Sequence, residues 1–413
     1  MGTEEGTPGL NVALLTGGGD RPYAFGLATA FLSKGLRLDL IAGDGLDSPE
    51  WHGTSQVNFL NLRGDQRPDA SWARKISRVL NYYIRLIKYA AISKPMIFHI
   101  LWNNKFEIFD RILLMLYYKL LRKKIVLTVH NVNAKKRDSN DTMLNRFSLK
   151  FQYRHADHLF VHTEKMKREL TEEFRVSASA ITVIPFGINN SVPNTSLTSS
   201  EARRRLGIAE KDRVLLFFGN IAPYKGLEYL VDAFQKVLAE NGNYRLIIAG
   251  NLKNCENYWN GIQGMITRDV NGGQILLKIE YIPDDETEVY FKTADLLVLP
   301  YRHIYQSGVL FLAYSFGLPV VATDVGALRE EIIEGRTGFV CRPEDSVDLA
   351  RAIETYFSSD LYEDLANRRQ GIRQYALERY SWDVISESTL NVYRELLGEQ
   401  FSDKPCAMSS RCS

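Results

Sequence analysis

The sequence LVLPYRHIYQSGVLFLAYSFGLPVVATDVGALREE, residues 297–331, indicates one strand, loop, helix and strand unit. An apolar strand at residues 296–299 leads into a polar loop, and Ser307 and Gly308 then open an apolar helix. A second strand follows at residues 320–322. The unpaired N–H groups and the positive dipole end of such a helix favour an anion. The unit therefore predicts a phosphate site where the loop meets the helix.

Strands and helices alternate on both sides of this unit. Apolar strands are predicted at residues 11–15, 37–42, 95–101, 124–129, 157–161, 181–185, 214–218, 244–249 and 275–279. Such alternation is typical of parallel sheets with helices on both faces. The chain has 413 residues, more than one ordinary domain, and residues 191–200 (SVPNTSLTSS) have the composition of a linker. We therefore predict two doubly wound, Rossmann-like α/β domains facing a central cleft, at residues 1–195 and 196–380.

The overall composition is that of an ordinary globular protein. Lys and Arg number 51 against 49 Asp and Glu, so the bulk charge gives no reason to expect nucleic acid as a partner. The polar start lacks a signal-peptide pattern, and no apolar run reaches the roughly 20 residues that span a bilayer. Four cysteines are too few for a disulfide framework. These features predict a cytoplasmic protein, with peripheral contact at the inner face of the plasma membrane left open.

One segment departs from this charge balance. Between Arg74 and Lys124 there are twelve Lys or Arg but only two acidic residues, Glu107 and Asp110. A helix expected at residues 71–91 is amphipathic. Its apolar stripe is formed by Ile76, Leu80, Tyr83 and Ile87. Its basic face is formed by Arg74, Arg78, Arg85 and Lys88. The basic face fits anionic lipid headgroups or an acidic lipid-linked substrate, and it equally fits a solvated surface.

Several polar or glycine-rich segments follow predicted strands of the first domain. A glycine-rich loop at residues 16–20 follows the first strand, Trp102 and Asn103 follow the third, and His130 follows the fourth. In an open parallel sheet, the carboxyl ends of the strands face the ligand crevice. We therefore expect these residues near a ligand, whereas a tight turn without a ligand is the alternative for the glycine loop.

Three neighbouring histidines, His155, His158 and His162, do not indicate a metal site. They surround a predicted strand, on which successive side chains point to opposite faces and cannot converge on one ion.

Taken together, the motifs resemble family-four retaining glycosyltransferases of the GT-B fold, also called glycosyl transferases group 1. The matching segments follow the family's order over nearly the whole chain: GGG (17–19), TVHN (128–131), IPFGI (184–188), FFGNIAPYKG (217–226), YIPDDE (281–286) and FGLPVVATDVGALREEIIEGRTGFV (316–340). The resemblance implies transfer of a sugar from a nucleotide-diphosphate sugar, held by the second domain, to a saccharide or lipid-linked acceptor, held by the first. It also implies that a helix at residues 381–400 crosses back to the first domain. The composition of residues 401–413 separately predicts a disordered tail.

The resemblance also assigns roles to individual positions. Lys225 matches the lysine that contacts the donor phosphates, whose negative charge grows as the glycosidic bond breaks. His130 matches a histidine near the transferred sugar. The other expected donor-binding residues are Gly18, Gly19, Asn220, Ile282, Arg302, Ser307, Gly308 and Val309. Trp102 and Asn103 are expected to bind the acceptor.

The chain departs from the family pattern at three positions. Asn220 stands where members usually carry an arginine, five residues before the lysine. Ile304 and Leu312 stand where members carry two glutamates that hold the sugar and the ribose. We expect Gln306 to take over near the sugar and Arg302 to supply the missing cation.

The resulting prediction is a retaining glycosyltransferase of surface polysaccharide or glycolipid assembly, with His130, Lys225 and Gln306 as its catalytic residues. No metal or other cofactor is expected, since Lys225 and helix dipoles can hold the diphosphate. Two alternatives stay open at this point. A sugar-nucleotide epimerase would need a paired acid and base in the cleft, and a catalytically inactive subunit would only bind the nucleotide sugar.

Overall fold

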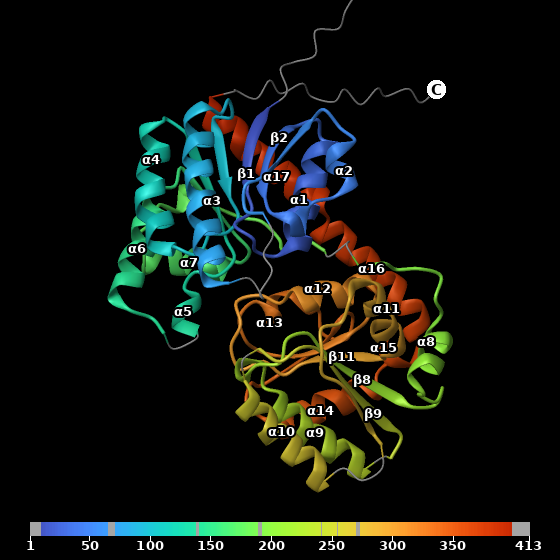
Figure 1. The fold of residues 1–413 in the computed structure, drawn as a ribbon. Coiled ribbons are helices and arrows are strands. Elements are labelled where there is room, and N and C mark those ends of the chain that lie inside the picture. Colours follow the sequence, from blue (N-terminus) through green and yellow to red (C-terminus); the bar gives the residue numbers. More distant parts are fainter. Residues whose placement is uncertain are drawn as a thin grey trace, which may run out of the picture.

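The computed structural model describes residues 10–64, 71–137, 140–188, 192–240, 242–253, 255–269 and 273–398. They form two α/β units, each built on one parallel sheet (Figure 1). Residues of both units line a cleft between them. The predicted fold class is therefore confirmed. The expected tail at 401–413, with Cys406 and Cys412, lies outside the described residues.

The first sheet has seven parallel strands in the order β3-β2-β1-β4-β5-β6-β7. Its strands are β1 (Asn11–Leu15), β2 (Arg37–Ala42), β3 (Val57–Asn61), β4 (Ile97–Ile100), β5 (Lys124–Val129), β6 (His158–Val161) and β7 (Ile181–Val183). The order reverses between β1 and β4, and ligands of open parallel sheets bind at such a switch point. The loops that leave β1 and β4 are therefore well placed to form a site.

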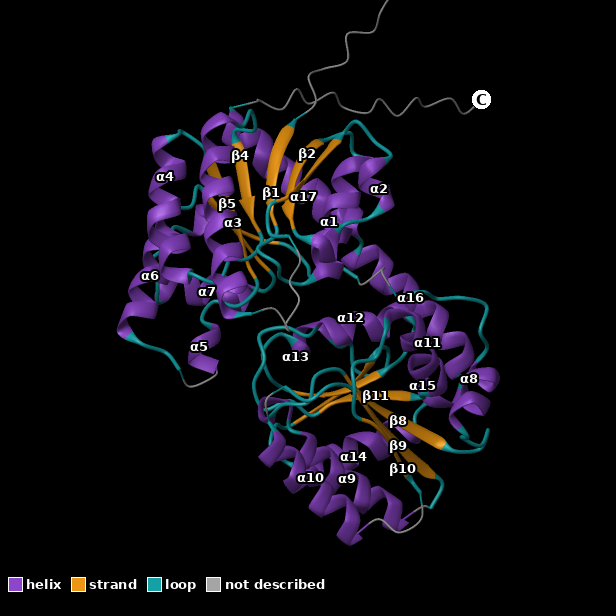
Figure 2. Ribbon diagram, viewed as in Figure 1, coloured by secondary structure: helices purple, strands orange, loops and turns teal. Residues whose placement is uncertain are grey.

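Helices cover both faces of this sheet (Figure 2). One apolar core joins the sheet to α3 (Trp72–Ile92), the π-helical segment η2 (Phe109–Leu114), α4 (Met115–Leu120), α6 (Met143–His155) and α7 (Glu164–Glu172). The other joins it to α1 (Arg21–Ser33), α2 (Pro49–His52) and the last helix, α17 (Trp382–Leu397). The remaining short elements are η1 (Asp44–Leu46), α5 (Ala134–Arg137) and η3 (Ala178–Ala180).

The second sheet has six parallel strands in the order β10-β9-β8-β11-β12-β13. Its strands are β8 (Arg213–Phe218), β9 (Tyr244–Ala249), β10 (Ile275–Lys278), β11 (Leu296–Leu299), β12 (Val320–Thr323) and β13 (Gly338–Cys341). The helices are α8 (Ser199–Leu206), η4 (Pro223–Lys225), α9 (Leu227–Glu240), α10 (Glu256–Asp269), α11 (Asp284–Thr293), α12 (Gly308–Ser315), α13 (Leu328–Glu331), α14 (Ser346–Phe357), α15 (Asp360–Glu363) and α16 (Leu365–Tyr380). Here the order reverses between β8 and β11, so the loops after these two strands face the switch point.

The chain passes between the two units at two places that touch each other. Helix α16 packs on α12 of the second unit, whereas α17, which follows it, packs on α1 of the first (Figure 1). Trp382 Nε1 donates a hydrogen bond to the carbonyl of Ile188 at 2.8 Å, and the Ile188 N–H donates to Tyr380 at 3.0 Å. A Cβ on Gly26 or on Gly187 would overlap the indole of Trp382, so both positions require glycine for this close approach.

Some expected elements were wrong or were missed. The predicted linker, residues 191–200, contains the start of α8. Strand β3 was missed because its residues are only half-buried and lack an apolar run. Of the apolar residues predicted to share one side of α3, Tyr83 is buried whereas Ile76 and Leu80 are exposed, because the buried face is formed by Tyr82, Tyr83, Leu86 and Ala90.

No helix in the described ranges is both long enough and apolar enough to cross a membrane.

Candidate active site

A cavity of about 370 Å³ lies between the two units and is lined by both. The first unit contributes the loop after β1, and the second contributes the loops after β8 and β11 together with the start of α12. Its lining residues are Asp20, Pro22, Tyr23, Phe186, Gly187, Asn220, Tyr224, Lys225, Tyr301, Ile304, Gln306, Ser307, Gly308, Val309, Leu312 and Trp382. The cavity therefore lies where both strand orders reverse, and it contains most of the residues expected at the phosphate end of a donor.

Lys225 is the cation of this cavity. It ends η4, only 7% of it is exposed, and its Nζ donates a hydrogen bond to Tyr301 Oη at 3.2 Å. The same Nζ lies 5.0 Å from the centre of the Tyr301 ring. Gly226 follows in the left-handed conformation, with φ of +63°, and a Cβ there would overlap the Pro300 carbonyl. The backbone turn thus fixes the lysine with its charge directed into the cleft and without a carboxylate partner in the described part of the chain.

The N-terminus of α12 lies beside this lysine. Tyr301 Oη is 3.3 Å from Ser307 Oγ, so one tyrosine hydroxyl links Lys225 to the N-cap residue of the helix. Gly308 and Val309, the first residues of α12, also line the cavity. A fixed ammonium group and free helical N–H groups on one wall suit an anion such as a diphosphate.

Gln306 lies next to this anion site and is unsatisfied. Both its Oε1 and its Nε2 are buried and have no hydrogen-bond partner among the described residues. The preceding residue, Tyr305, holds the loop in place: its Oη donates to Glu169 Oε1 of the first unit at 3.1 Å, and its carbonyl accepts from Ala327 N–H at 3.1 Å. A buried carboxamide without partners is costly, so its position favours a ligand that supplies hydroxyl groups.

His130 lies in a cluster of rings behind the cavity. Its ring stacks on Trp102 with 4.1 Å between centroids, and the edge of Tyr23 meets it at 4.7 Å. His130 Nδ1 lies 3.0 Å from His162 Nε2, and His162 Nδ1 donates to the Ile184 carbonyl at 3.2 Å. Burial holds the pKa of His130 well below its ordinary range and lowers that of His162 to about 4. Both rings are therefore neutral at pH 7, and since His162 uses its proton on Ile184, His130 donates from Nδ1 and keeps Nε2 as an acceptor.

Two buried histidines, His99 and His162, make the stability of the fold depend on pH. Burial lowers the folded-state pKa of His99 to about 3 and that of His162 to about 4, so protonation favours the unfolded chain below pH 6.5. Between pH 6.5 and 5, each should remove about 2 kcal/mol from the free energy of unfolding. Denaturant titrations at both pH values should show this loss. In His162→Gln, the loss of unfolding free energy between these pH values should be smaller by the contribution of that one histidine. The exposed His155→Gln serves as the control, and equal losses in both variants would contradict the assignment.

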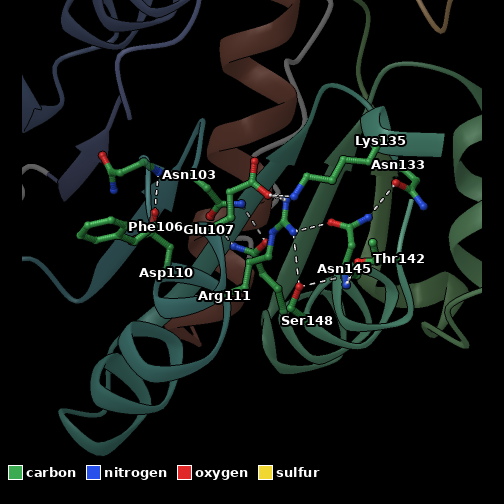
Figure 3. Close-up of polar contacts among 12 residues, drawn as sticks. Asn103, Phe106, Glu107, Asp110, Arg111, Asn133, Lys135, Thr142, Asn145 and Ser148 are labelled. Carbon is green, nitrogen blue, oxygen red and sulfur yellow. Dashed lines mark hydrogen bonds and ion pairs between the residues drawn. The ribbon is translucent and has the colours of Figure 1, made fainter. Parts of the chain in front are cut away.

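A second cavity, of about 210 Å³, lies at the carboxyl ends of β4 and β5. Trp102, Asn103 and His130 line it, together with side chains that come from η2 and α6. Figure 3 shows the polar network of its wall. Arg111 donates to Asn145 Oδ1 at 2.9 Å and pairs with Glu107 at 3.1 Å, and Glu107 also pairs with Lys135 at 2.9 Å.

The wall of this second cavity also contains amide pairs. Asn103 and Gln152 exchange two hydrogen bonds, at 3.0 and 2.7 Å. Arg111 is only 8% exposed, yet its Nε has no partner within the described ranges. Carboxamide groups and a guanidinium N–H without an acceptor suit a ligand rich in hydroxyl groups.

Several predicted residues do not line either cavity. Gly18 and Gly19 lie against Arg63 and Trp102, and Ile282 is buried in the core of the second unit. Arg302, the expected substitute cation, pairs with Glu344 at 3.2 Å and with Glu228 at 3.8 Å. The roles of these residues stay predictions.

Other lining residues were not anticipated. Tyr301 lies two residues after the end of β11, so the rule used for His130 could have found it. Tyr23 lies inside α1, where that rule does not apply. Arg111, Asn145 and Gln152 gave no local signal, because helix packing alone brings them together. Within the residues that the structure describes, no three His, Cys, Asp or Glu side chains are grouped so as to hold a metal ion.

Two facing parallel-sheet units, with a cation and a helix N-terminus in the cleft between them, define a GT-B-type transferase architecture. Family profiles agree with this class: "Glycosyltransferase Family 4" matches residues 17–192, and "Glycosyl transferases group 1" matches residues 212–359. The chain belongs to this glycosyltransferase family.

Individual relatives have low sequence identity to this chain but align with most of its length. The chain is 24% identical to an uncharacterised glycosyltransferase of Methanocaldococcus jannaschii, over 92% of this chain and 96% of that one. It is 25% identical to a D-inositol 3-phosphate glycosyltransferase of Corynebacterium aurimucosum, over 67% of this chain and 65% of the relative.

Solved structures share the fold. Sucrose-phosphate synthase of Thermosynechococcus elongatus superposes with a TM-score of 0.73 at 17% identity, over 95% of this chain and all of that one. Anabaena HepE, solved in complex with UDP-glucose, gives a TM-score of 0.70 at 16% identity, over 94% of this chain and all of that one.

Proposed function

We propose that this glycosyltransferase moves a sugar from a nucleotide-diphosphate sugar to a saccharide or lipid-linked acceptor, with retention of the anomeric configuration. The observation that carries this proposal is the unsatisfied carboxamide of Gln306 beside Lys225 and the start of α12. An anion site next to unpaired hydroxyl-binding groups matches the two chemical ends of such a donor. HepE, a protein of the same fold, has been solved with UDP-glucose, which supports a nucleotide sugar here.

In the proposed reaction, Lys225 and the N–H groups of α12 stabilise the charge that the diphosphate gains as the glycosidic bond breaks. Asp20, a carboxylate that lines the cleft, accepts the Tyr23 N–H at 3.0 Å as the cap of α1. It is therefore held as a helix cap rather than as a nucleophile. The donor phosphate would then take the proton of the acceptor hydroxyl on the face from which the diphosphate departs.

We also propose that the reaction needs no metal ion. Lys225 and the α12 dipole already supply positive charge where a cation would bind the diphosphate. Sugar transfer should therefore stay within about twofold of its starting rate after treatment with EDTA. Loss of activity that Mg²⁺ or Mn²⁺ restores would contradict this part of the proposal.

A donor panel separates the proposal from its alternatives. The full chain is incubated with nucleotide sugars, and nucleoside diphosphate release is followed with and without candidate acceptors. Acceptor-dependent release supports transfer, conversion of the donor without an acceptor supports an epimerase, and binding without release supports an inactive subunit. Because several relatives are named D-inositol 3-phosphate glycosyltransferases, this cyclitol phosphate belongs in the acceptor panel.

We further propose that the protein works at the inner face of the plasma membrane, in surface polysaccharide or glycolipid assembly. Three cations of α3 that were expected to meet lipid headgroups, Arg74, Arg85 and Lys88, are exposed in the structure. Arg78, the fourth, is half-buried. These cations favour an anionic surface, at about 1 kcal/mol for each residue close to it.

A further inference from the structure

Exposed apolar side chains are concentrated on one side of the first unit. Of the 20 large apolar residues that are exposed in the described part of the chain, 14 fall between Trp72 and Phe147. They are Trp72, Ile76, Leu80, Ile84, Ile92, Met96, Phe106, Ile108, Leu113, Leu116, Leu120, Met143, Leu144 and Phe147. Most lie on α3, on η2 with α4, and on α6. Single exposed apolar residues are common in soluble proteins, but a gathering of this size indicates an interaction surface.

These helices form one outer layer over the same face of the sheet (Figure 2). Tyr117 Oη of α4 donates to the Ile87 carbonyl of α3 at 3.1 Å, and α6 packs against η2. On α3, Trp72, Ile76, Leu80 and Ile84 recur every four residues, so they share one outward stripe. The exposed residues of the neighbouring helices thus extend one surface, which we call the apolar face.

The charges around the apolar face are mostly positive. Helices α3, α4 and α6, with η2, contain ten Lys or Arg and one acidic residue, Asp110, which is buried. The whole chain carries a net charge of only +2, so this concentration is local. The cations include Arg74, Arg85, Lys88, Lys150 and Arg154, all exposed. Apolar stripes flanked by Lys and Arg are typical of helices that lie in the interface of an anionic bilayer.

We infer that the apolar face inserts into the headgroup layer of an anionic membrane, which seats the first unit on the bilayer. This inference extends the proposed membrane contact of α3 from an electrostatic attraction to an embedded surface of several helices. A second copy of the chain fits less well, because pairing these faces would oppose many like charges. The inference also specifies the class of acceptor: Met143, Leu144 and Phe147 share α6 with Asn145 of the second cavity, so a lipid-borne acceptor could reach that cavity from the membrane.

Vesicle flotation of the full chain tests the inference. We expect binding to phosphatidylcholine vesicles that contain about 30% phosphatidylglycerol, and weak binding to phosphatidylcholine alone. The variant Ile76→Ser/Leu80→Ser/Leu116→Ser/Leu120→Ser should lower the partition coefficient by about tenfold or more. The matched control is Val347→Ser/Leu377→Ser, which changes exposed apolar residues of the second unit and should bind as the unmodified protein does.

A second measurement reports insertion directly. Trp72 is 81% exposed, whereas Trp51, Trp259 and Trp382 are buried. Lipids with brominated acyl chains should quench part of the tryptophan fluorescence of the bound protein. This quenching should be lost in Trp72→Phe. The inference fails if anionic vesicles do not bind the protein, or if the fourfold variant binds them unchanged. It also fails if that variant only converts a dimer into a monomer in light scattering. None of these readouts needs a donor sugar, so a failure here is distinct from a failure of sugar transfer.

Discussion

Replacing Lys225 with alanine is expected to lower kcat/KM for sugar transfer by about 100-fold, the usual effect of removing one group that stabilises transition-state charge. The side chain is buried in the cleft, and it faces the start of α12 through the hydroxyl of Tyr301. Its charge is therefore fixed before the diphosphate departs, and solvent does not screen it fully. Alanine removes this charge and leaves the helix N–H groups alone with the leaving group. Nucleoside diphosphate release under kcat/KM conditions measures the effect.

Two comparisons make the Lys225 result interpretable. Lys211→Ala removes an exposed lysine of the same unit and should change the rate less than twofold. Tyr301 keeps Ser307 as a partner in Lys225→Ala, so thermal unfolding should stay cooperative. An unchanged rate in a folded Lys225→Ala protein would remove the lysine from the proposed mechanism.

Replacing Gln306 with leucine should change stability and activity in opposite directions. In the unliganded protein, both polar atoms of the side chain are buried without partners, so an apolar group of similar size should raise the free energy of unfolding by about 1 kcal/mol. The same change removes the hydroxyl-binding group of the sugar end, and kcat/KM should fall at least tenfold. Denaturant unfolding and diphosphate release, measured on one preparation, report both effects.

A gain in stability together with a loss of activity would identify Gln306 as a ligand-binding residue rather than a structural one. Gln370→Leu, on the exposed side of α16, should change neither quantity appreciably. If Gln306→Leu destabilised the protein, the carboxamide would have a structural partner in solution. If its activity stayed unchanged, the sugar would be held elsewhere in the cleft.

The parallel sheets were predictable because their strands are buried on both faces and therefore appear as continuous apolar runs. Residues 124–129 and 244–249 were predicted with their observed bounds. Strand β3 was not predicted because a half-buried edge strand needs no such run. The apolar residues predicted on one side of α3 are only partly buried for a related reason. Sequence periodicity finds an apolar stripe but does not say whether a core or a solvent faces it, and α3 has apolar residues on both sides.

The phosphate end of the site was predictable and the second cavity was not. Lys225, Ser307, Gly308 and Val309 belong to local motifs, and the structure gathers them in one cavity. Gln306 was found from its place directly before the helix. The wall of the second cavity joins Arg111 to Asn145 across 34 residues, a contact that only the packing of η2 against α6 creates. Site roles inferred from resemblance, such as those of Ile282 and Arg302, stay predictions.

The contact between Ile188 and the segment from Tyr380 to Trp382 determines which relative motions the two units can make. The polypeptide leaves the first unit and returns to it at nearly the same point in space, and hydrogen bonds at 2.8 and 3.0 Å tie the two crossings together. Sliding of one unit past the other would separate the crossings, whereas rotation about this contact would keep them together. A rotation that opens the cleft would also have to release Tyr305 of the second unit from Glu169 of the first. A change of a few degrees at Ile188 would be amplified with distance from this contact.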